Sequence, residues 1–320
     1  MTTASVPWWP PSRQYPWRVA PEAIGRSVFS MLSVQELKML DWLARSLPIE
    51  DMCIVDAGCF LGGSTVALCR GLAGNPGLEK LGKIHVFDMF VAPRNPYSLH
   101  AIGNGRQPGD CVRDLFDSNV AEFYPFLNVK AGDVRQQAAP QQSVGLLFVD
   151  IAKDWDINDY VVKTLISKLV PKRSILIQQD YNDHSCPWIN VTMQRFADHF
   201  EHLVDVGSSR VYLYDAPIPP DRLATPLRAE HSSGSILQLM DREIQTCGNS
   251  ISHFFNLCTK SWLLFEFEGA EAAITHLQAI ASKQPWASPE PYANIVIKSI
   301  LAHRTAEAFK RHQRTMFERF

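Results

Sequence analysis

Short apolar runs alternate with amphipathic stretches along the central part of the chain. Several runs are continuous in Val, Ile, Leu and Phe, the pattern of strands whose two faces are both covered by helices. Such alternation predicts a doubly wound α/β fold built on a parallel sheet. The predicted strands are Cys53–Ala57, Ile84–Asp88, Phe126–Lys130, Val144–Asp150, Ser174–Gln178, His202–Val206 and Val211–Tyr214.

The last two predicted strands are separated only by the residues from Gly207 to Arg210. A connection this short suits an antiparallel hairpin, because a parallel crossover needs room for a helix. We therefore expect a seven-stranded, mostly parallel sheet with an antiparallel last strand.

Different patterns flank the strands on both sides. Residues 1–32 are rich in proline and aromatic side chains, among them Trp8, Trp9 and Trp17. This predicts an irregular arm, which either packs on its own body or a second subunit, or covers a pocket. Ser33 and Glu36 then fit a capping box at the start of a helix. The C-terminal part has helical patterning over residues 235–246, 250–267, 270–282 and 292–317.

These patterns divide the chain into three parts. We expect an N-terminal arm (residues 1–32), an α/β domain (33–216) and a helical C-terminal extension (217–320). The helices of the extension carry many aromatic side chains outside the sheet, which is compatible with a homodimer.

Composition excludes several classes of function. The 320 residues are 46% hydrophobic and 20% charged, enough for a sizeable core. With 31 Lys and Arg against 33 Asp and Glu, the chain has no basic excess for nucleic acid. The apolar runs are far shorter than the ~18 residues that span a bilayer, and residues 1–13 lack the pattern of a secretory signal. Seven cysteines without a CxxC pair suit reduced thiols in the cytoplasm.

A glycine-rich turn is the first candidate for a ligand-binding segment. The first predicted strand passes Asp56 and Gly58 and turns at Gly62 into a helix that begins with Ser64 and Thr65. Glycine lets the backbone approach a ligand where a Cβ would clash. A helix N-terminus offers free N–H groups to a carboxylate or phosphate. The two glycines are spaced differently from those of the GxGxxG turn of dinucleotide folds.

Two further aspartates follow strands. Asp88 ends the second strand, where a carboxylate can accept the hydroxyl groups of a ribose; a capping role is the alternative. Asp133 follows the third strand and is placed to meet an adenine amino group, although by itself it is an ordinary turn residue.

Together these features resemble the class I, Rossmann-like S-adenosylmethionine-dependent methyltransferases over residues 35–215. The resemblance implies that the α/β domain binds S-adenosylmethionine, with Asp88 on the ribose and Asp133 on the adenine. Val86–Phe90 and the Asp-Tyr pair after the fifth strand resemble the small-molecule O-methyltransferase branch that includes macrocin O-methyltransferase. The implied cofactor-binding set is Asp56, Gly58, Cys59, Phe60, Gly62, Ser64, Thr65, Asp88, Met89, Asp133, Val134 and Asp150.

The fourth and fifth strands lead to Asp150 and Asp180. In the similar O-methyltransferases, catechol O-methyltransferase among them, such strand ends supply oxygen ligands to Mg²⁺, which needs several of them. Here Gln179 replaces an expected acidic residue, and Ala152 and Lys153 stand where a histidine is usual. The donor set is weakened, and the sequence leaves the presence of Mg²⁺ undecided.

Lys153 follows Asp150 at the spacing of a catalytic lysine in catechol methylation. It can act as a general base only if burial lowers its pKa; the alternative is a solvated, protonated lysine in an acidic loop. Tyr181 follows Asp180 at the carboxyl edge of the sheet, where doubly wound folds bind ligands. The candidate catalytic residues are Asp150, Lys153, Asp180 and Tyr181.

The expected activity is methyl transfer to an oxygen or nitrogen of a small metabolite, in natural-product biosynthesis. The alternative is a cyclase similar to the azetidine-2-carboxylate synthases. These enzymes resemble methyltransferases in fold, close the α-amine of S-adenosylmethionine on its γ-carbon, and release methylthioadenosine without a metal. A third alternative is a non-catalytic relative that binds through its helical extension.

Overall fold

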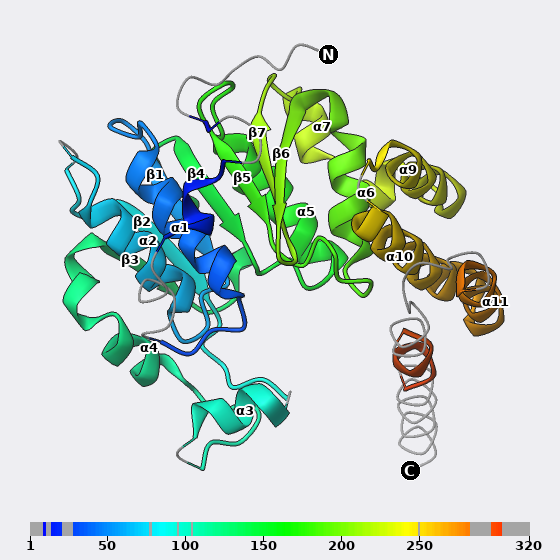
Figure 1. Cartoon of the computed structure of the whole chain (residues 1–320), viewed down its shortest axis with the longest axis horizontal. Helices are drawn as coiled ribbons and strands as arrows, with labels where there is room; N and C mark the ends of the chain where they lie inside the picture. Colours follow the sequence, from blue (N-terminus) through cyan, green and yellow to red (C-terminus); the bar gives the residue numbers. More distant parts are fainter. Residues whose placement is uncertain are drawn as a thin grey trace. The chain divides into compact units, whose positions relative to one another are not determined.

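The computed structural model describes residues 9–10, 14–20, 28–76, 79–94, 96–103, 105–248, 250–281 and 296–302. Seven strands form one sheet in the order β3-β2-β1-β4-β5-β7-β6 (Figure 1). Strands β1 to β5 pair in parallel, and β7 is antiparallel to both of its neighbours. The strands are β1 (Cys53–Ala57), β2 (Ile84–Asp88), β3 (Leu127–Ala131), β4 (Val144–Val149), β5 (Ile175–Gln178), β6 (Phe200–Val206) and β7 (Ser209–Tyr214).

The predicted fold class is confirmed. Strands β1 and β2 have the bounds predicted from their apolar runs, and the other strands begin or end within two residues of the prediction. The largest difference lies in the β6–β7 hairpin, where Val206 pairs with Ser209 and the turn contains only Gly207 and Ser208. Gly207 has a φ of 60°, which glycine adopts without the steric cost of a side chain.

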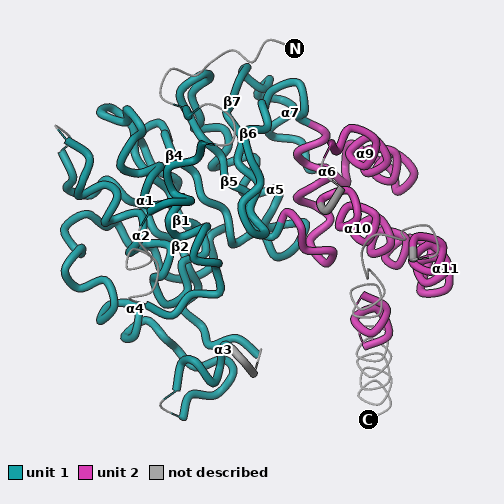
Figure 2. The backbone as a smooth tube through the Cα atoms, viewed as in Figure 1, with its two compact units in different colours: residues 1–180, 196–226 teal, residues 181–195, 227–320 magenta. Residues whose placement is uncertain are grey.

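The chain divides into two compact units (Figure 2). Unit 1 contains residues 1–180 and 196–226, and unit 2 contains residues 181–195 and 227–320. The α/β unit thus extends past residue 216, while a segment between β5 and β6 belongs with the C-terminal helices. The helices of unit 1 are α1 (Val34–Ser46), α2 (Gly63–Ala73), α3 (Pro96–Ile102), α4 (Arg113–Asn119), α5 (Trp155–Thr164) and α7 (Pro220–Ala224).

Unit 2 is helical throughout its described regular structure. Its helices are α6 (Pro187–Arg195), α8 (Leu227–Glu230), α9 (Ser233–Thr246), α10 (Ser250–Glu268) and α11 (Ala270–Ala281). Helix α6 packs on α9 and α10, and α10 packs on α11. Of the helix expected over residues 292–317, residues 296–302 are helical, and the others lie outside the described residues.

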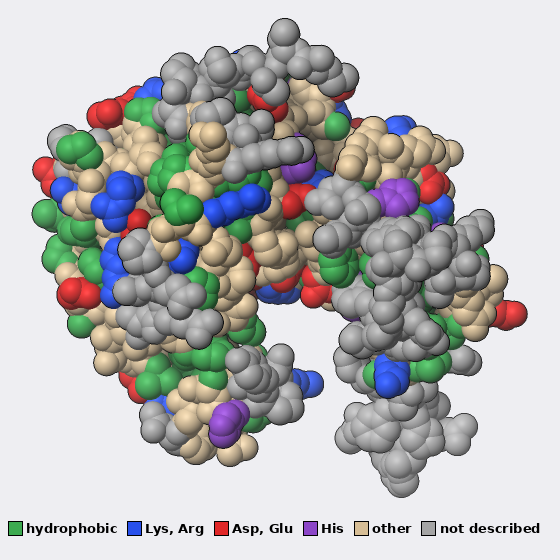
Figure 3. Space-filling view, viewed as in Figure 1, with side chains coloured by type: hydrophobic (Ala, Val, Ile, Leu, Met, Phe, Trp, Pro, Cys, Tyr) green, Lys and Arg blue, Asp and Glu red, His purple; other side chains and the backbone are tan. Residues whose placement is uncertain are grey.

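The charges on the surface and the length of the apolar helices agree with what the composition predicts. Lys and Arg side chains occur on the described surface of unit 1 together with Asp and Glu (Figure 3), as the nearly balanced charge requires. Among the described helices, none combines the length and the apolar character that a bilayer crossing demands.

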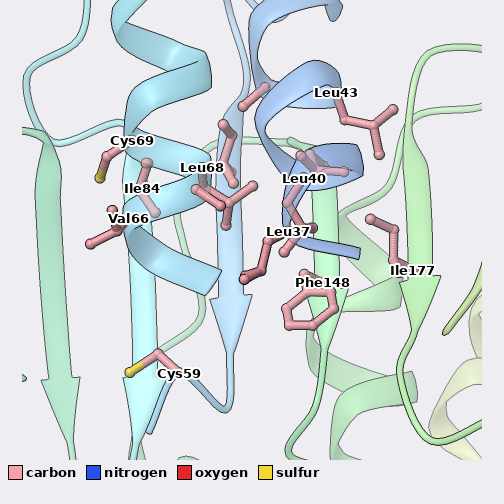
Figure 4. Close-up of a cluster of buried hydrophobic side chains, with 14 of the residues drawn as sticks. Leu37, Leu40, Leu43, Cys59, Val66, Leu68, Cys69, Ile84, Phe148 and Ile177 are labelled. Carbon is pink, nitrogen blue, oxygen red and sulfur yellow. The ribbon is translucent and has the colours of Figure 1, made fainter. Parts of the chain in front are cut away.

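Helices α1 and α2 pack side by side against the sheet. The predicted capping box starts α1: the Ser33 hydroxyl accepts the Glu36 N–H, and the Glu36 carboxylate accepts the Ser33 N–H. Leu37, Leu40 and Leu43 of α1 lie in one buried cluster with side chains of α2 and the strands (Figure 4). Each leucine removed from water in this way contributes roughly 1.5–3 kcal/mol.

The described part of the N-terminal arm packs on α1. Trp9, Tyr15 and Trp17 form an aromatic cluster with Trp42, in which the Tyr15 and Trp17 rings stack at 4.7 Å and Trp17 lies 5.1 Å from Trp42. Trp17 is buried. For these residues the arm packs on its own body; Trp8 lies outside the described residues.

Gly71 provides a test of the α1–α2 contact. A Cβ at Gly71 would lie 2.1 Å from the backbone oxygen of Asp41, so no side chain fits without movement of the helices. We expect Gly71→Ala to lower the free energy of unfolding by about 2 kcal/mol in urea denaturation. At Gly234 in α9 the nearest atom is 3.9 Å away, so Gly234→Ala is expected to raise it by about 0.5 kcal/mol. Equal losses for both variants would contradict the packing argument.

Candidate functional site

The loop between β1 and α2 lies at the carboxyl ends of β1, β2 and β4. The N–H of Gly58 donates to the carbonyl of Phe87 at 2.8 Å, and the N–H of Asp150 donates to Ala57 at 2.7 Å. A Cβ on Gly58 would lie 2.6 Å from the carbonyl carbon and oxygen of Asp150. Gly58 is therefore required first by the approach of the β4 backbone, where sequence reasoning had attributed it to a ligand.

Gly62 ends this loop and caps α2. Its φ of 95° lies in the left-handed region, and its N–H donates to Cys59 at 2.8 Å. A Cβ would lie 2.9 Å from Val120 Cγ1. The first-turn N–H groups of α2 have no acceptor within their own helix, and they carry the positive end of the helix dipole.

Asp56 anchors the start of α2 to β1. Its carboxylate is fully buried and accepts the hydroxyl of Ser64 at 3.0 Å and that of Thr65 at 2.6 Å. Burial raises the pKa of Asp56 to about 6, against the lowering effect of the two hydroxyl donors. Both predicted cofactor-binding hydroxyls are therefore engaged in holding the loop.

Asp88 holds two strained backbone segments. Its carboxylate accepts the N–H of Phe60 at 2.7 Å and the N–H of Phe90 at 2.6 Å. These two phenylalanines have φ of 51° and 52°, in the left-handed region that bulky residues seldom adopt. Burial raises the pKa of Asp88, although the two N–H groups lower it. Each carboxylate oxygen has a second lone pair, so Asp88 retains capacity for further donors.

A pocket opens beside this loop, with about 270 Å³ of empty space that includes solvent-exposed volume. The N-terminal segment before α1 forms one wall, where the rings of Phe29 and Phe60 meet edge to face at 6.4 Å. Part of the arm therefore lines a pocket, while its predicted role as a cover stays a prediction. Sequence reasoning had predicted Gly58, Cys59, Phe60, Ser64 and Asp150 of the lining, but not residues 29–32, which no motif marks. The lining residues are Phe29, Ser30, Met31, Leu32, Gly58, Cys59, Phe60, Ser64 and Asp150.

The turn after β3 adjoins the end of β2. The N–H of Gly132 donates to the carbonyl of Asp88 at 2.9 Å. Asp133 accepts the N–H of Arg135 and forms an ion pair with its guanidinium at 2.6 Å, which lowers the pKa of Asp133. Val134 is buried. Met89, which follows β2, has 54% of its surface exposed.

Lys153 joins the ends of β4 and β5. Its ammonium lies 2.6 Å from Asp150 Oδ1 and 2.5 Å from Asp180 Oδ2. Burial alone would lower the pKa of Lys153, but the two carboxylates raise it above its usual value. Burial raises the pKa of Asp150, against the lowering effect of Lys153. A protonated lysine has no lone pair to accept a proton, so this arrangement does not provide a general base at Lys153.

The donor set at these strand ends does not fit Mg²⁺. Among the described residues, no three His, Cys, Asp or Glu side chains converge as metal ligands. Asp150 and Asp180 both bind the Lys153 ammonium, and the side-chain amide of Gln179 donates to Ser208 at 3.1 Å. A divalent ion would have to displace the lysine before it met two carboxylates.

Tyr181 and Asp180 are adjacent in sequence but belong to different units. The Tyr181 side chain is fully buried, and its hydroxyl donates to Glu243 of α9 at 2.5 Å. Asn190 donates to the backbone oxygen of Tyr181 and to Asn256, all within unit 2. These contacts place Tyr181 in the polar interior of the helical unit. They do not bear on its predicted role beside the substrate, which stays a prediction.

The raised pKa of Asp56 predicts a pH dependence. The native protein binds more protons than the unfolded chain between the unfolded value of about 4 and the folded value of about 6. This carboxyl therefore costs stability as the pH rises, by up to about 3 kcal/mol. We expect the free energy of unfolding of Asp56→Asn, relative to the wild type, to increase from pH 4 to pH 7 in urea titrations.

Asp51 provides the control for this experiment. It is exposed and pairs with Arg173 at 2.6 Å, which lowers the pKa of Asp51. Its stabilising effect is lost only as the pH falls below about 4, so the relative stability of Asp51→Asn should stay nearly constant from pH 4 to pH 7. A difference between Asp56→Asn and the wild type that is constant from pH 4 to pH 7 would contradict the prediction.

No protein-family profile matches the sequence, and no curated protein matches it. The structure is similar to that of the O-methyltransferase NovP, with a TM-score of 0.46 and 13% identity over 58% of this chain and 82% of that chain. For the calicheamicin methyltransferase CalS11 the TM-score is 0.41, with 15% identity over 56% of this chain and 77% of the other. For coclaurine N-methyltransferase it is 0.31, with 10% identity over 75% and 70%. The strand order and directions themselves are those of a doubly wound, Rossmann-like sheet with an antiparallel last strand, as expected from the sequence.

Proposed function

We propose that this chain is an S-adenosylmethionine-dependent methyltransferase that acts on an oxygen or nitrogen of a small metabolite in natural-product biosynthesis. The observation that carries the proposal is the pocket at the carboxyl ends of β1 and β4, in a sheet of this order. Doubly wound folds bind their ligands at this edge. Gly58, Ser64 and Asp150 line the pocket, and Asp88 holds Phe60 in its wall.

The residues around the pocket suit the parts of the cofactor. Asp88 would accept the ribose hydroxyl groups, Met89 would contact the adenine, and Asp133 would accept the adenine amino group. Asp150 and the N-terminus of α2 would bind the charged amino and carboxylate groups of the methionine part. The cofactor supplies a methyl group that its sulfonium already activates. The chain then has to orient the acceptor and exclude water.

A second reaction fits the same pocket. The structure provides no free base at Lys153, because both carboxylates bind its ammonium. This favours a reaction in which Lys153 does not have to remove a proton from a methyl acceptor. In the cyclase alternative, the substrate's own α-amine would form the new bond to the γ-carbon. The C–S bond would break with its electron pair on sulfur, methylthioadenosine would leave, and an amine proton would pass to solvent.

We place the reaction in the cytoplasm, with a small molecule as substrate and a homodimer as the assembly. Cys53, Cys69 and Cys258 are buried thiols and Cys111 is an exposed one, which is in keeping with a reducing compartment. Light scattering on the purified protein measures the assembly directly.

Met89 offers a test of cofactor binding that leaves the strained loops in place. Its exposed side chain follows Asp88, at the carboxyl end of β2. We expect Met89→Ala to weaken S-adenosylmethionine binding about tenfold in calorimetry, because apolar contact with the adenine is lost. Leu81 is also exposed but precedes the amino end of β2, so Leu81→Ala should bind like the wild type. Wild-type affinity in both variants would count against this placement of the adenine.

The products separate the two reactions. The protein is incubated with S-adenosylmethionine alone, and then with candidate acceptors, and the products are separated by chromatography. Methyl transfer predicts S-adenosylhomocysteine that appears only with an acceptor. Methylthioadenosine without any acceptor would establish the cyclase alternative, and the absence of cofactor binding would overturn both.

A further inference from the structure

At the carboxyl ends of β4 and β5, the ammonium group of Lys153 lies between two carboxylates. Lys153 reaches Asp150 and Asp180 with N···O distances of 2.6 and 2.5 Å, as charge-assisted hydrogen bonds. Asp150 directly follows β4, and Asp180 lies two residues after the end of β5. In the O-methyltransferases that the sequence resembles, these strand ends supply oxygen ligands to Mg²⁺.

The backbone around the ammonium is built to bring the two carboxylates together. The N–H of Asp150 donates to Ala57 at the end of β1, and the N–H of Gln179 donates to Val149 of β4. Asp180 has a φ of 61°, a left-handed conformation that aspartate tolerates better than most residues. The conformation turns the chain directly after the sheet, at the residue whose carboxylate meets Lys153.

The geometry points to Lys153 as a built-in cation that replaces a divalent metal at this site, so that the reaction proposed above proceeds without Mg²⁺. Only the last clause depends on the proposed function. The cation site itself is a property of Asp150, Lys153 and Asp180.

Charge and connectivity favour the lysine over a free ion. Two carboxylates and one ammonium together carry a single negative charge, whereas the two carboxylates without the ammonium would repel each other. A tethered ammonium is present at a fixed effective concentration, and it needs no dehydration of a divalent ion to bind. A metal would have to displace both hydrogen bonds and leave the ammonium without either partner.

The ammonium also has capacity for a bound molecule. Two of its three protons are directed to the carboxylates, and no further acceptor is recorded for it among the residues that the structure describes. The side chain is 52% exposed, so a third proton can be donated to an oxygen of the substrate. In this arrangement Lys153 is a positioning residue, which orients the substrate without accepting its proton.

Mn²⁺ uptake tests the replacement directly, and the measurement contains no S-adenosylmethionine. Electron paramagnetic resonance of free Mn²⁺ is compared for the wild type, Lys153→Ala, and the double variant Lys153→Ala with Asp180→Asn. We expect no saturable uptake by the wild type. Lys153→Ala should bind one Mn²⁺ with a Kd of about 10⁻³ M or tighter, because its two carboxylates are freed. The double variant should lose this binding.

Two further variants keep the result interpretable. Lys153→Met removes the charge but keeps the apolar stem, so it replaces the alanine variant if that variant unfolds, and Mn²⁺ should raise its Tm. Lys172 pairs with one carboxylate, Asp215, and has a similar exposure of 56%, so Lys172→Ala should gain no Mn²⁺ site.

Two outcomes would overturn the inference. Saturable Mn²⁺ uptake by the wild type that Asp180→Asn abolishes would show that a metal outcompetes the lysine. No uptake by either folded Lys153 variant would show that the carboxylates do not form a cation site. Calorimetry with S-adenosylmethionine is a separate measurement, so failure of the proposed function would be distinguished from failure of this inference.

Discussion

The close approach of β1 and β4 at their carboxyl ends is the constraint on which the rest of the site depends. At Gly58 the backbone following β1 comes so near to the main chain of Asp150 that a Cβ would overlap it. The same approach places Asp150 beside the pocket and within reach of Lys153. One steric requirement therefore links the loop between β1 and α2 to the cluster of Asp150, Lys153 and Asp180.

The aspartates at this edge of the sheet are stabilised by different donors. Asp56 accepts side-chain hydroxyl groups, Asp88 accepts backbone N–H groups, and Asp150 and Asp180 share an ammonium. A buried carboxylate without such donors would be costly, so each pairing also determines the position of the segment that supplies the donor. In this way charge satisfaction organises the loops of the site, including the two strained phenylalanines.

The boundary between the two units falls between two adjacent residues, Asp180 and Tyr181, whose side chains have different partners. Asp180 belongs to the α/β unit and its carboxylate meets Lys153, whereas Tyr181 belongs to the helical unit and its hydroxyl meets Glu243. The Asp-Tyr pair is thus the point at which the chain passes from one unit to the other. Its first residue contributes to the charged cluster, and its second contributes to a buried polar network.

Local patterns in the sequence determined the strands β1 and β2, the capping box at Ser33 and the helical C-terminal part, because periodicity and capping are properties of neighbouring residues. The glycines of the loop between β1 and α2 and the aspartates at the strand ends were also identifiable, since they lie at or after the ends of predicted strands. Only the tertiary structure decided which groups meet. Lys153 and Asp180 are 27 positions apart, and the order of the strands brings them together. Likewise, the backbone that excludes a side chain at Gly58 is that of Asp150 and Ile151 after β4, and no local pattern records such a contact.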